Sequence, residues 1–178
     1  MKRIVIIVLL ILGVLVFFII PKEDRVQRII VAVGQKAPEF ELPEIDPNSK
    51  NPPKIWSSSD LKGKVVFINF WASWCKECRI EMPSIQRLYD KMKDRPFQMI
   101  TILYREAPEK AMAYMKVNGF TMPVLLDEGN KTAYSYGLTG VPETYIIDKE
   151  GIVKKRHIGG GVWDSPETLS FIENLLKP

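Results

Sequence analysis

The chain has 178 residues, a length that fits one globular domain with an additional segment. Hydrophobic residues make up 46% of the sequence and charged residues 26%, which is ordinary for a folded domain and argues against a disordered chain. The net charge of +4 comes from 25 basic and 21 acidic side chains that are scattered along the sequence. Nucleic-acid binding is therefore not expected, because it usually requires a clustered stripe of Lys and Arg.

The first apolar segment is long enough to cross a membrane. Residues 4–20 carry no polar side chain, and a helix that spans the hydrocarbon core needs roughly 17 to 25 such residues. Basic residues precede this segment, and positive charge on a short leading flank favours keeping that flank in the cytoplasm. A cleaved signal peptide would end in small residues, whereas Pro21 follows here. We expect an uncleaved anchor over residues 1–21, with its N-terminus in the cytoplasm, and a charged tether over 22–34.

The remaining segment, 35–178, predicts one α/β domain. The expected elements are short strands near Phe40 and Ile55, strands over 65–70, 97–103, 124–126, 144–147 and 152–158, and helices over 75–93, 108–118, 131–136 and 166–177. The unbroken apolar run 65–70 is typical of a central strand that is covered on both faces. The turn residues at 148–151 predict a hairpin between the last two strands. This order indicates a central mixed sheet flanked by helices.

The two cysteines of the chain, Cys75 and Cys78, form one local pair or none. Structural zinc usually needs four ligands, and the single histidine, His157, is expected on a strand surface, so we predict no metal site. The pair falls where a buried strand meets a helix, and unpaired backbone N–H groups at a helix start stabilise a thiolate. Cys75 is therefore the expected nucleophile, and Cys78, one turn later, the expected resolving thiol. This chemistry needs a redox-active disulfide and no other cofactor.

The surroundings of the pair resemble the thioredoxin superfamily. Residues 70–74 (FWASW) precede the cysteines, and Pro83 lies where the active-site helix of that superfamily carries its kink proline. Pro142 lies where the superfamily places a cis-proline beside the dithiol, so the resemblance implies that the backbone of Val141 and Pro142 pairs with an extended substrate. Trp74 is expected to line the substrate surface.

Within that superfamily the chain resembles the membrane-tethered TlpA, ResA and DsbE (CcmG) group. The shared motifs are GQKAPEFEL at 34–42, DLKGK at 60–64 and GVPETYIID at 140–148. The resemblance implies a thioredoxin-like domain with an N-terminal β-hairpin and a central αβ insertion, behind a single transmembrane helix. The loop 47–53 departs from the group, because it is longer than the usual hairpin turn.

The resolving thiol needs a proton acceptor. Thioredoxin has a buried aspartate six residues before its first cysteine, whereas this chain has Asn69, whose amide cannot titrate. Glu81, one turn beyond Cys78, matches a glutamate that the ResA-like group carries beside its dithiol, and Glu143 directly follows Pro142. We predict Glu81 as the acceptor and Glu143 as a residue of the substrate site. The alternative for Glu81 is a position on a solvated helix face.

The resemblance implies a single-pass protein of the cytoplasmic (inner) membrane whose catalytic domain lies on the periplasmic, extracytoplasmic side. It implies that the protein reduces disulfides of exported proteins such as apocytochrome c, and that a transmembrane thiol donor of the DsbD or CcdA kind reduces it again. An oxidant or a general reductase on the same fold stays open, because Lys76 favours the thiolate and Glu77 opposes it. A Cu(I) metallochaperone is the alternative from another class. A peroxidase is disfavoured by the close pairing of the cysteines.

Overall fold

The computed structural model describes residues 30–47 and 51–177. The predicted anchor and most of the predicted tether lie outside these residues. Within the described residues, no helix has the length and apolar character that crossing a membrane requires.

The predicted elements of the domain are all present, and the ends of those with predicted bounds differ by at most one residue. In chain order they are β1 (Glu41–Pro43), β2 (Ile55–Ser57), β3 (Val65–Trp71), α2 (Lys76–Met92), β4 (Phe97–Leu103), α3 (Pro108–Asn118), β5 (Val124–Leu126), α4 (Lys131–Ser135), β6 (Glu143–Ile147), β7 (Val153–Ile158) and α5 (Pro166–Leu176). Two short 3-10 helices, Ser58–Leu61 and Glu128–Asn130, were not predicted.

The central sheet is mixed, as the sequence predicts, with the strand order β5-β4-β3-β6-β7. β3, β4 and β5 run parallel because α2 and α3 provide the crossovers between them. β6 runs antiparallel to β3 and is joined to β7 by the predicted hairpin. Every residue of β3 is buried, so the strand that leads to the cysteines is the central one.

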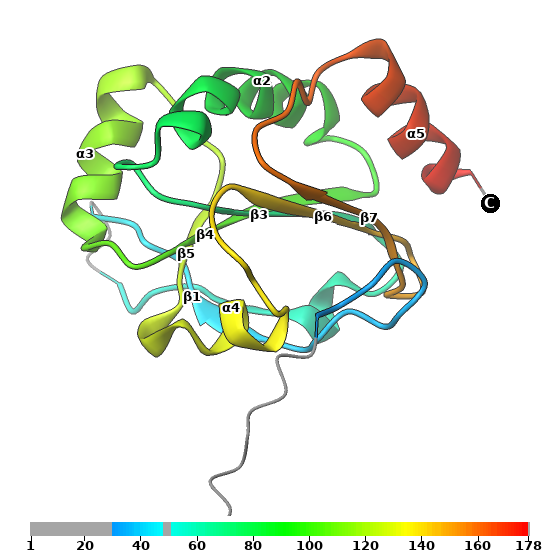
Figure 1. Cartoon of the computed structure of the whole chain (residues 1–178), viewed down its shortest axis with the longest axis horizontal. Helices are drawn as coiled ribbons and strands as arrows, with labels where there is room; N and C mark the ends of the chain where they lie inside the picture. Colours follow the sequence, from blue (N-terminus) through cyan, green and yellow to red (C-terminus); the bar gives the residue numbers. More distant parts are fainter. Residues whose placement is uncertain (1–29, 48–50, 178) are drawn as a thin grey trace, which may run out of the picture.

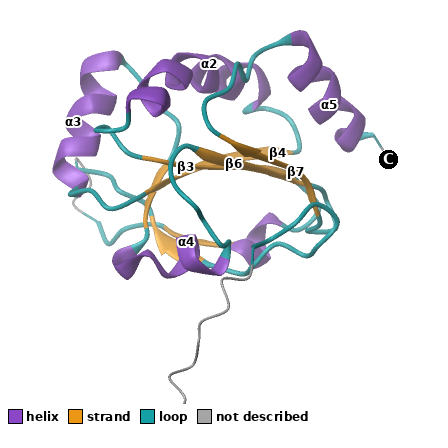
Figure 2. Ribbon diagram, in the orientation of Figure 1, coloured by secondary structure: helices purple, strands orange, loops and turns teal. Residues whose placement is uncertain are grey.

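Helices cover one face of the sheet, and a thinner layer covers the other (Figure 1). On the first face, α2, α3 and α5 pack against Phe67 and Trp71 of β3. On the second face, α4 and the β1–β2 hairpin pack against Ile68 and Phe70 of the same strand (Figure 2). Because side chains alternate along a strand, odd-numbered residues of β3 face α2 and even-numbered residues face α4. This alternation decides which polar side chains can reach the dithiol.

The N-terminal part of the domain contacts both edge strands of the sheet. The N–H of Gly34 donates to the carbonyl of Val153 on β7 at 2.8 Å, and the N–H of Val153 donates to Gln35 at 2.9 Å. The predicted hairpin forms between β1 and β2, and the N–H of Ile45 beyond it donates to Val124 of β5 at 2.8 Å. At these positions the backbone groups of the edge strands are paired and not free for other chains.

The predicted insertion consists of α3 and β5. Pro108 occupies the first turn of α3, where a missing N–H costs nothing. Gly119 ends the helix with a φ of 68°, a left-handed conformation that favours glycine. The insertion places α3 beside the end of β3, where Tyr114 contacts Trp71 with ring centroids 6.0 Å apart.

Candidate active site

The cysteine pair lies at the start of α2, directly after the central strand. Cys75 is the N-cap residue of the helix, and its sulfur accepts the backbone N–H of Cys78 at 3.1 Å. The two sulfurs are joined in a disulfide. Residue Cys75 is 7% exposed whereas Cys78 is fully buried, so Cys75 is the cysteine of the pair that a partner can approach. This geometry suits Cys75 as the attacking thiolate, because the N-cap position stabilises negative charge.

A carboxylate fixes the loop that leads into the pair. Glu106, in the loop after β4, accepts the backbone N–H of Ser73 at 2.8 Å and also accepts the Ser73 hydroxyl. Trp74 follows in the same loop and is 57% exposed beside Cys75. Glu106 thus anchors the loop at Ser73, while the Trp74 side chain faces solvent.

The predicted cis-proline is present and lies against the dithiol. The Val141–Pro142 peptide bond is cis, and the Cys75 sulfur lies 3.6 Å from the carbonyl oxygen of Val141. The carbonyl of Pro142 accepts the N–H of Gly159 at 3.0 Å and is therefore occupied. Val141 remains half-buried, and its backbone is the part of this turn that borders the sulfur.

Glu81 is buried beneath the start of α2, with 1% of its surface exposed. Its Oε1 accepts the amide N–H of Asn69 at 2.9 Å, and its Oε2 accepts N–H groups from Gly161 at 2.9 Å and Trp163 at 2.7 Å. Burial raises the pKa of Glu81, and the hydrogen bonds from Trp163, Gly161 and Asn69 oppose this rise in part. The alternative of a solvated helix-surface glutamate is wrong for Glu81.

Comparison with known proteins agrees with this geometry. The model of the AhpC/TSA family matches residues 33–156, which include the cysteine pair and the cis-proline. The chain belongs to the AhpC/TSA family.

Relatives within this family share most of the chain. The thiol-disulfide oxidoreductase ResA of Bacillus thuringiensis is 33% identical over 172 residues, covering 97% of this chain and 92% of the relative. The thioredoxin-like protein YneN of Bacillus subtilis is 34% identical over 128 residues, covering 71% of each chain. A solved thiol:disulfide interchange protein of the thioredoxin family from Chlorobium tepidum is 28% identical, covers 82% of this chain and 99% of its own, and superposes with a TM-score of 0.67. The protein is a thiol-disulfide oxidoreductase of the ResA type with a thioredoxin-like fold.

Two residues of the oxidoreductase site escaped prediction. Gly161 and Trp163 bind Glu81 across about 80 positions of sequence, and no local pattern links them to α2. The one available signal is the run Gly159–Gly160–Gly161 after β7, because a Cβ atom at Gly160 would lie 3.5 Å from the Glu77 carbonyl oxygen. Repeated glycines in such a place often mark a close approach of two backbones.

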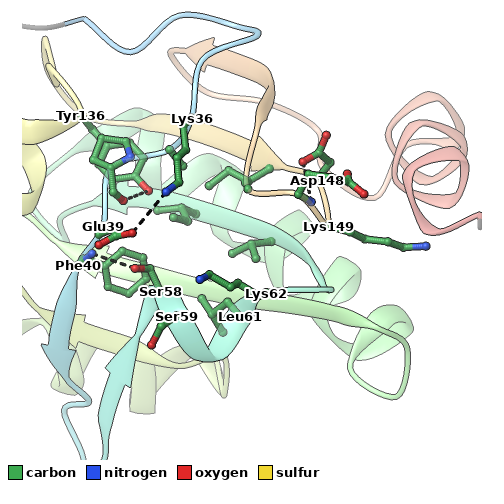
Figure 3. A pocket seen from close by; sticks show the side chains of 17 residues that line it. Lys36, Glu39, Phe40, Ser58, Ser59, Leu61, Lys62, Tyr136, Asp148 and Lys149 are labelled. Atoms are coloured by element: carbon green, nitrogen blue, oxygen red, sulfur yellow. Dashed lines mark hydrogen bonds and ion pairs between the residues drawn. The ribbon is translucent and has the colours of Figure 1, made fainter.

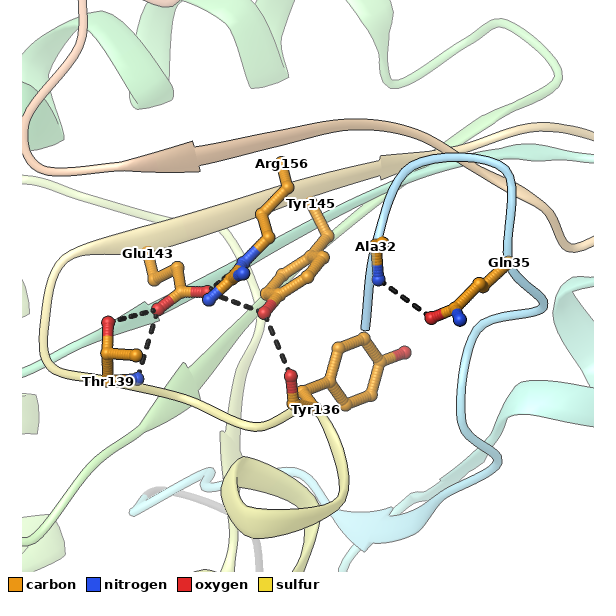
Figure 4. A network of polar contacts seen from close by, with 7 residues as sticks. All are labelled: Ala32, Gln35, Tyr136, Thr139, Glu143, Tyr145 and Arg156. Carbon is orange, nitrogen blue, oxygen red and sulfur yellow. Dashed lines mark hydrogen bonds and ion pairs between the residues drawn. The ribbon is translucent and has the colours of Figure 1, made fainter. Parts of the chain in front are cut away.

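Glu143 lies on the other face of the sheet from Glu81. The register pairs Glu143 with Phe70 and Thr144 with Asn69, so the Glu143 side chain points toward the α4 side. It is fully buried, pairs with Arg156 at 2.6 Å and accepts the Tyr145 hydroxyl at 2.5 Å (Figure 4). Burial, together with this hydrogen bond, raises the pKa of Tyr145, so the phenol stays protonated and donates.

The second oxygen of Glu143 reaches the turn that carries the cis-proline. Its Oε2 accepts the backbone N–H and the hydroxyl of Thr139, each at 3.2 Å (Figure 4). The structure therefore does not bring the Glu143 carboxylate to the sulfurs. It places that carboxylate on the α4 side of the sheet, where its hydrogen bonds with Thr139 anchor the turn 139–142.

A hollow on the α4 face has no residue in common with the predicted site. It is lined by apolar side chains of β3 and β6 and by the segment around Phe40, with Lys36 and Lys62 at its rim (Figure 3). The Tyr136 hydroxyl at its edge donates to the Pro38 carbonyl at 3.3 Å. Within residues 30–47 and 51–177, no three His, Cys, Asp or Glu side chains lie together as metal ligands would.

Proposed function

We propose that residues 4–20 hold this oxidoreductase on the outer side of the cytoplasmic membrane, where it reduces disulfides of exported proteins such as apocytochrome c. A transmembrane thiol donor of the DsbD or CcdA kind would return it to the dithiol form. The observation that carries the proposal is the position of the Cys75 sulfur at the N-cap of α2, beside the Val141 carbonyl, in the less buried of the two cysteines. The match to ResA supports the tethered arrangement, because it extends over 97% of this chain and so reaches into the apolar segment.

The first half of the reaction uses Cys75. Its thiolate attacks one sulfur of the partner's disulfide, a bond forms between these two sulfurs, and the partner's S–S bond breaks. The other partner sulfur leaves as a thiolate and takes up a proton. The Val141 backbone borders the sulfur in a position to pair with the partner's extended chain.

The second half uses Cys78 and Glu81. Glu81 accepts the Cys78 proton, the Cys78 thiolate attacks the Cys75 sulfur, and the mixed disulfide breaks as the Cys75–Cys78 disulfide forms. The partner leaves as a thiolate and is protonated, so two electrons have passed to it. Asn69 cannot take the proton, whereas Glu81 is buried and hydrogen-bonded to it at 2.9 Å.

The reduction potential of the pair tests the direction of electron flow. We expect a value near that of thioredoxin, about −270 mV, or lower. A value near that of the oxidant DsbA, about −120 mV, would identify a disulfide donor instead. Titration of the reduced full chain with Cu(I) in the same buffer tests the metallochaperone alternative, and tight binding of one Cu(I) per pair would favour it.

Location and substrate are tested in cells that express the full chain. We expect the protein to stay in alkali-washed membranes and to be cleaved by protease added to spheroplasts, because residues 4–20 are apolar throughout. Release by alkali, or protection from the protease, would contradict the tethered arrangement. Deletion of the gene should lower covalent haem attachment to exported cytochrome c, and an added thiol reductant should restore it. Normal haem attachment in the deletion strain would exclude apocytochrome c as a required substrate.

A further inference from the structure

The Glu81 carboxylate is capped by the segment that joins β7 to α5. Two N–H groups from this segment, those of Gly161 and Trp163, bind the same oxygen, Oε2, at 2.9 and 2.7 Å. The other oxygen, Oε1, accepts the single N–H of Asn69 at 2.9 Å. The two oxygens of one carboxylate therefore have different surroundings.

Trp163 is fixed in this position from several sides. Only 2% of its surface is exposed, and its backbone N–H donates to the Ser84 hydroxyl on α2 at 3.0 Å. Its ring meets Phe67 and His157 edge-on, with centroids 5.1 and 5.3 Å apart. A Cβ atom at Gly161 would lie 2.9 Å from the indole, so this close approach requires glycine there.

We propose that Trp163 is a positioning residue for the dithiol: its indole N–H keeps the buried Glu81 carboxylate ionised and directs the Cys78 proton to Oε1. This inference depends on the proposed function, because it requires Glu81 to be the proton acceptor. An indole nitrogen and a backbone amide donate but do not accept hydrogen bonds, so a proton on Oε2 would displace them. Oε1 keeps a free lone pair and is the oxygen that can take up the proton.

The electrostatics of the site agree with the geometry. Burial raises the pKa of Glu81, and the Trp163 hydrogen bond is the largest of the interactions that lower it. Among the described residues, the titratable group of a neighbouring element that acts on Glu81 is His157 of β7, whose protonated form also favours the carboxylate. The sheet presents neutral groups, Asn69 and, beyond it, Thr144. On α2 itself the ionisable neighbours are Cys78 and, one turn before Glu81, Glu77, whose side chain lies against Gly159 and Gly160 of the capping segment.

The test replaces the indole by a ring without an N–H. In the full-length protein, Trp163→Phe should move the acidic limb of the pH profile for insulin disulfide reduction upward by about one pH unit, because a hydrogen bond to the charged form is lost. At a fixed pH on that limb the rate should fall about tenfold. The matched control is Trp56→Phe, which removes another indole-to-glutamate bond, Trp56 Nε1 to Glu44 at 2.8 Å, in β2 and away from the dithiol. This control should leave the limb unchanged.

Two outcomes of the kinetic test would overturn the inference. One is a Trp163→Phe profile that coincides with that of Trp56→Phe. The other is a shift between the Trp163→Phe and Trp56→Phe profiles that disappears when both variants also carry His157→Gln, because the titrating group would then be the histidine. If Glu81→Gln itself leaves the profile unchanged, the proposed role of Glu81 as proton acceptor fails, and the direction of the Cys78 proton to Oε1 fails with it. The next measurement separately decides whether the Trp163 indole stabilises the ionised Glu81 carboxylate.

That measurement uses the unsubstituted protein and does not depend on turnover or on the folding of a variant. The indole N–H resonance of Trp163 should shift with pH together with the Glu81 carboxyl carbon resonance, with one common midpoint above 4.5, the ordinary value for this carboxyl. The indole resonance of Trp56 should not follow that midpoint. An indole signal of Trp163 that stays constant while Glu81 titrates would overturn the inference.

Discussion

At the scale of residues, the two glutamates predicted for the site have different tasks. Glu81 lies on the α2 face of the sheet and is bound through three N–H donors near the resolving thiol. Glu143 lies on the opposite face and binds the turn that carries Val141. The pleat of β6 and its register with β3 produce this separation.

Glu81→Gln should remove the acidic limb from the pH profile of disulfide exchange. Burial raises the pKa of Glu81, so the carboxyl stays protonated to a pH above 4.5 and becomes a base as the pH rises through that raised value. Glutamine has no such transition. The measurement is the rate of insulin reduction from about pH 4, below the raised carboxyl pKa, to about pH 9, above the ordinary thiol pKa of about 8.5. Asp90→Asn, on an exposed position of the same helix, is the control and should keep the limb.

Thr139→Val should weaken protein-substrate binding and spare the thiol chemistry. The variant loses the hydroxyl that Glu143 accepts at 3.2 Å, so the turn 139–142 loses part of its anchor. A lost hydrogen bond of this kind costs about 0.5–1.5 kcal/mol, which corresponds to a rise in KM of roughly two- to tenfold. The rate with a small aromatic disulfide should not change, and Thr121→Val on an exposed site is the control. An equal loss with both substrates would place Thr139 in the chemistry rather than in docking.

At the scale of elements, the helix start and the hairpin turn each depend on a few capping groups. Cys75 caps α2 with its own sulfur, which joins the redox group to the helix dipole. Asp148 closes the β6–β7 hairpin by accepting the N–H groups of Glu150 at 3.0 Å and Ile152 at 2.8 Å, and it pairs with Lys154. The hairpin in turn holds β6, which carries Glu143 and the turn before it.

Asp148→Ala should destabilise the fold by about 1–3 kcal/mol, because a buried carboxylate that accepts two backbone N–H groups and pairs with Lys154 is lost. Burial alone would raise the pKa of Asp148, but the N–H donors and Lys154 outweigh it and hold the pKa below 3.8. A lowered carboxyl pKa stabilises the fold above the unfolded-state value, and this contribution is lost as the pH falls through the folded-state value. Urea unfolding at pH 7 and pH 2.5 (about one unit below the ordinary pKa) should therefore show a smaller difference between variant and parent at the acidic pH. Glu150→Ala, on an exposed turn position, is the control. A pH-independent difference would mean that Asp148 does not act through its charge.

At the scale of the whole molecule, the sequence predicted the succession of elements and the dithiol with its cis-proline. The elements and the dithiol are local features, because apolar periods, Pro108 at a helix start and the cysteine spacing each lie within a few residues. The cis-proline was implied by the resemblance to the thioredoxin superfamily. The contacts of Glu81 with Gly161 and Trp163 join segments about 80 residues apart and depend on how β7 leads back over α2. The face on which Glu143 lies depends on its pairing with Phe70. The sequence of one strand alone does not determine its register with the next strand. Long-range contacts therefore account for what the sequence left open.

The assignment of Cys75 as the attacking thiol and Cys78 as the resolving thiol is tested most directly by trapping the mixed disulfide with a substrate. Cys78→Ser should accumulate a mixed disulfide with a protein substrate that contains a disulfide. Cys75 attacks that disulfide, and no second cysteine is present to resolve the product. Cys75→Ser should accumulate little, since the Cys78 sulfur has no exposed surface. Mass spectrometry of the non-reduced adducts measures both. An adduct through Cys75 that exceeds the Cys78 adduct by tenfold or more (about 1.4 kcal/mol) is the expected result, and equal adducts, or none from either variant, would contradict exchange through an attacking Cys75 at the start of α2.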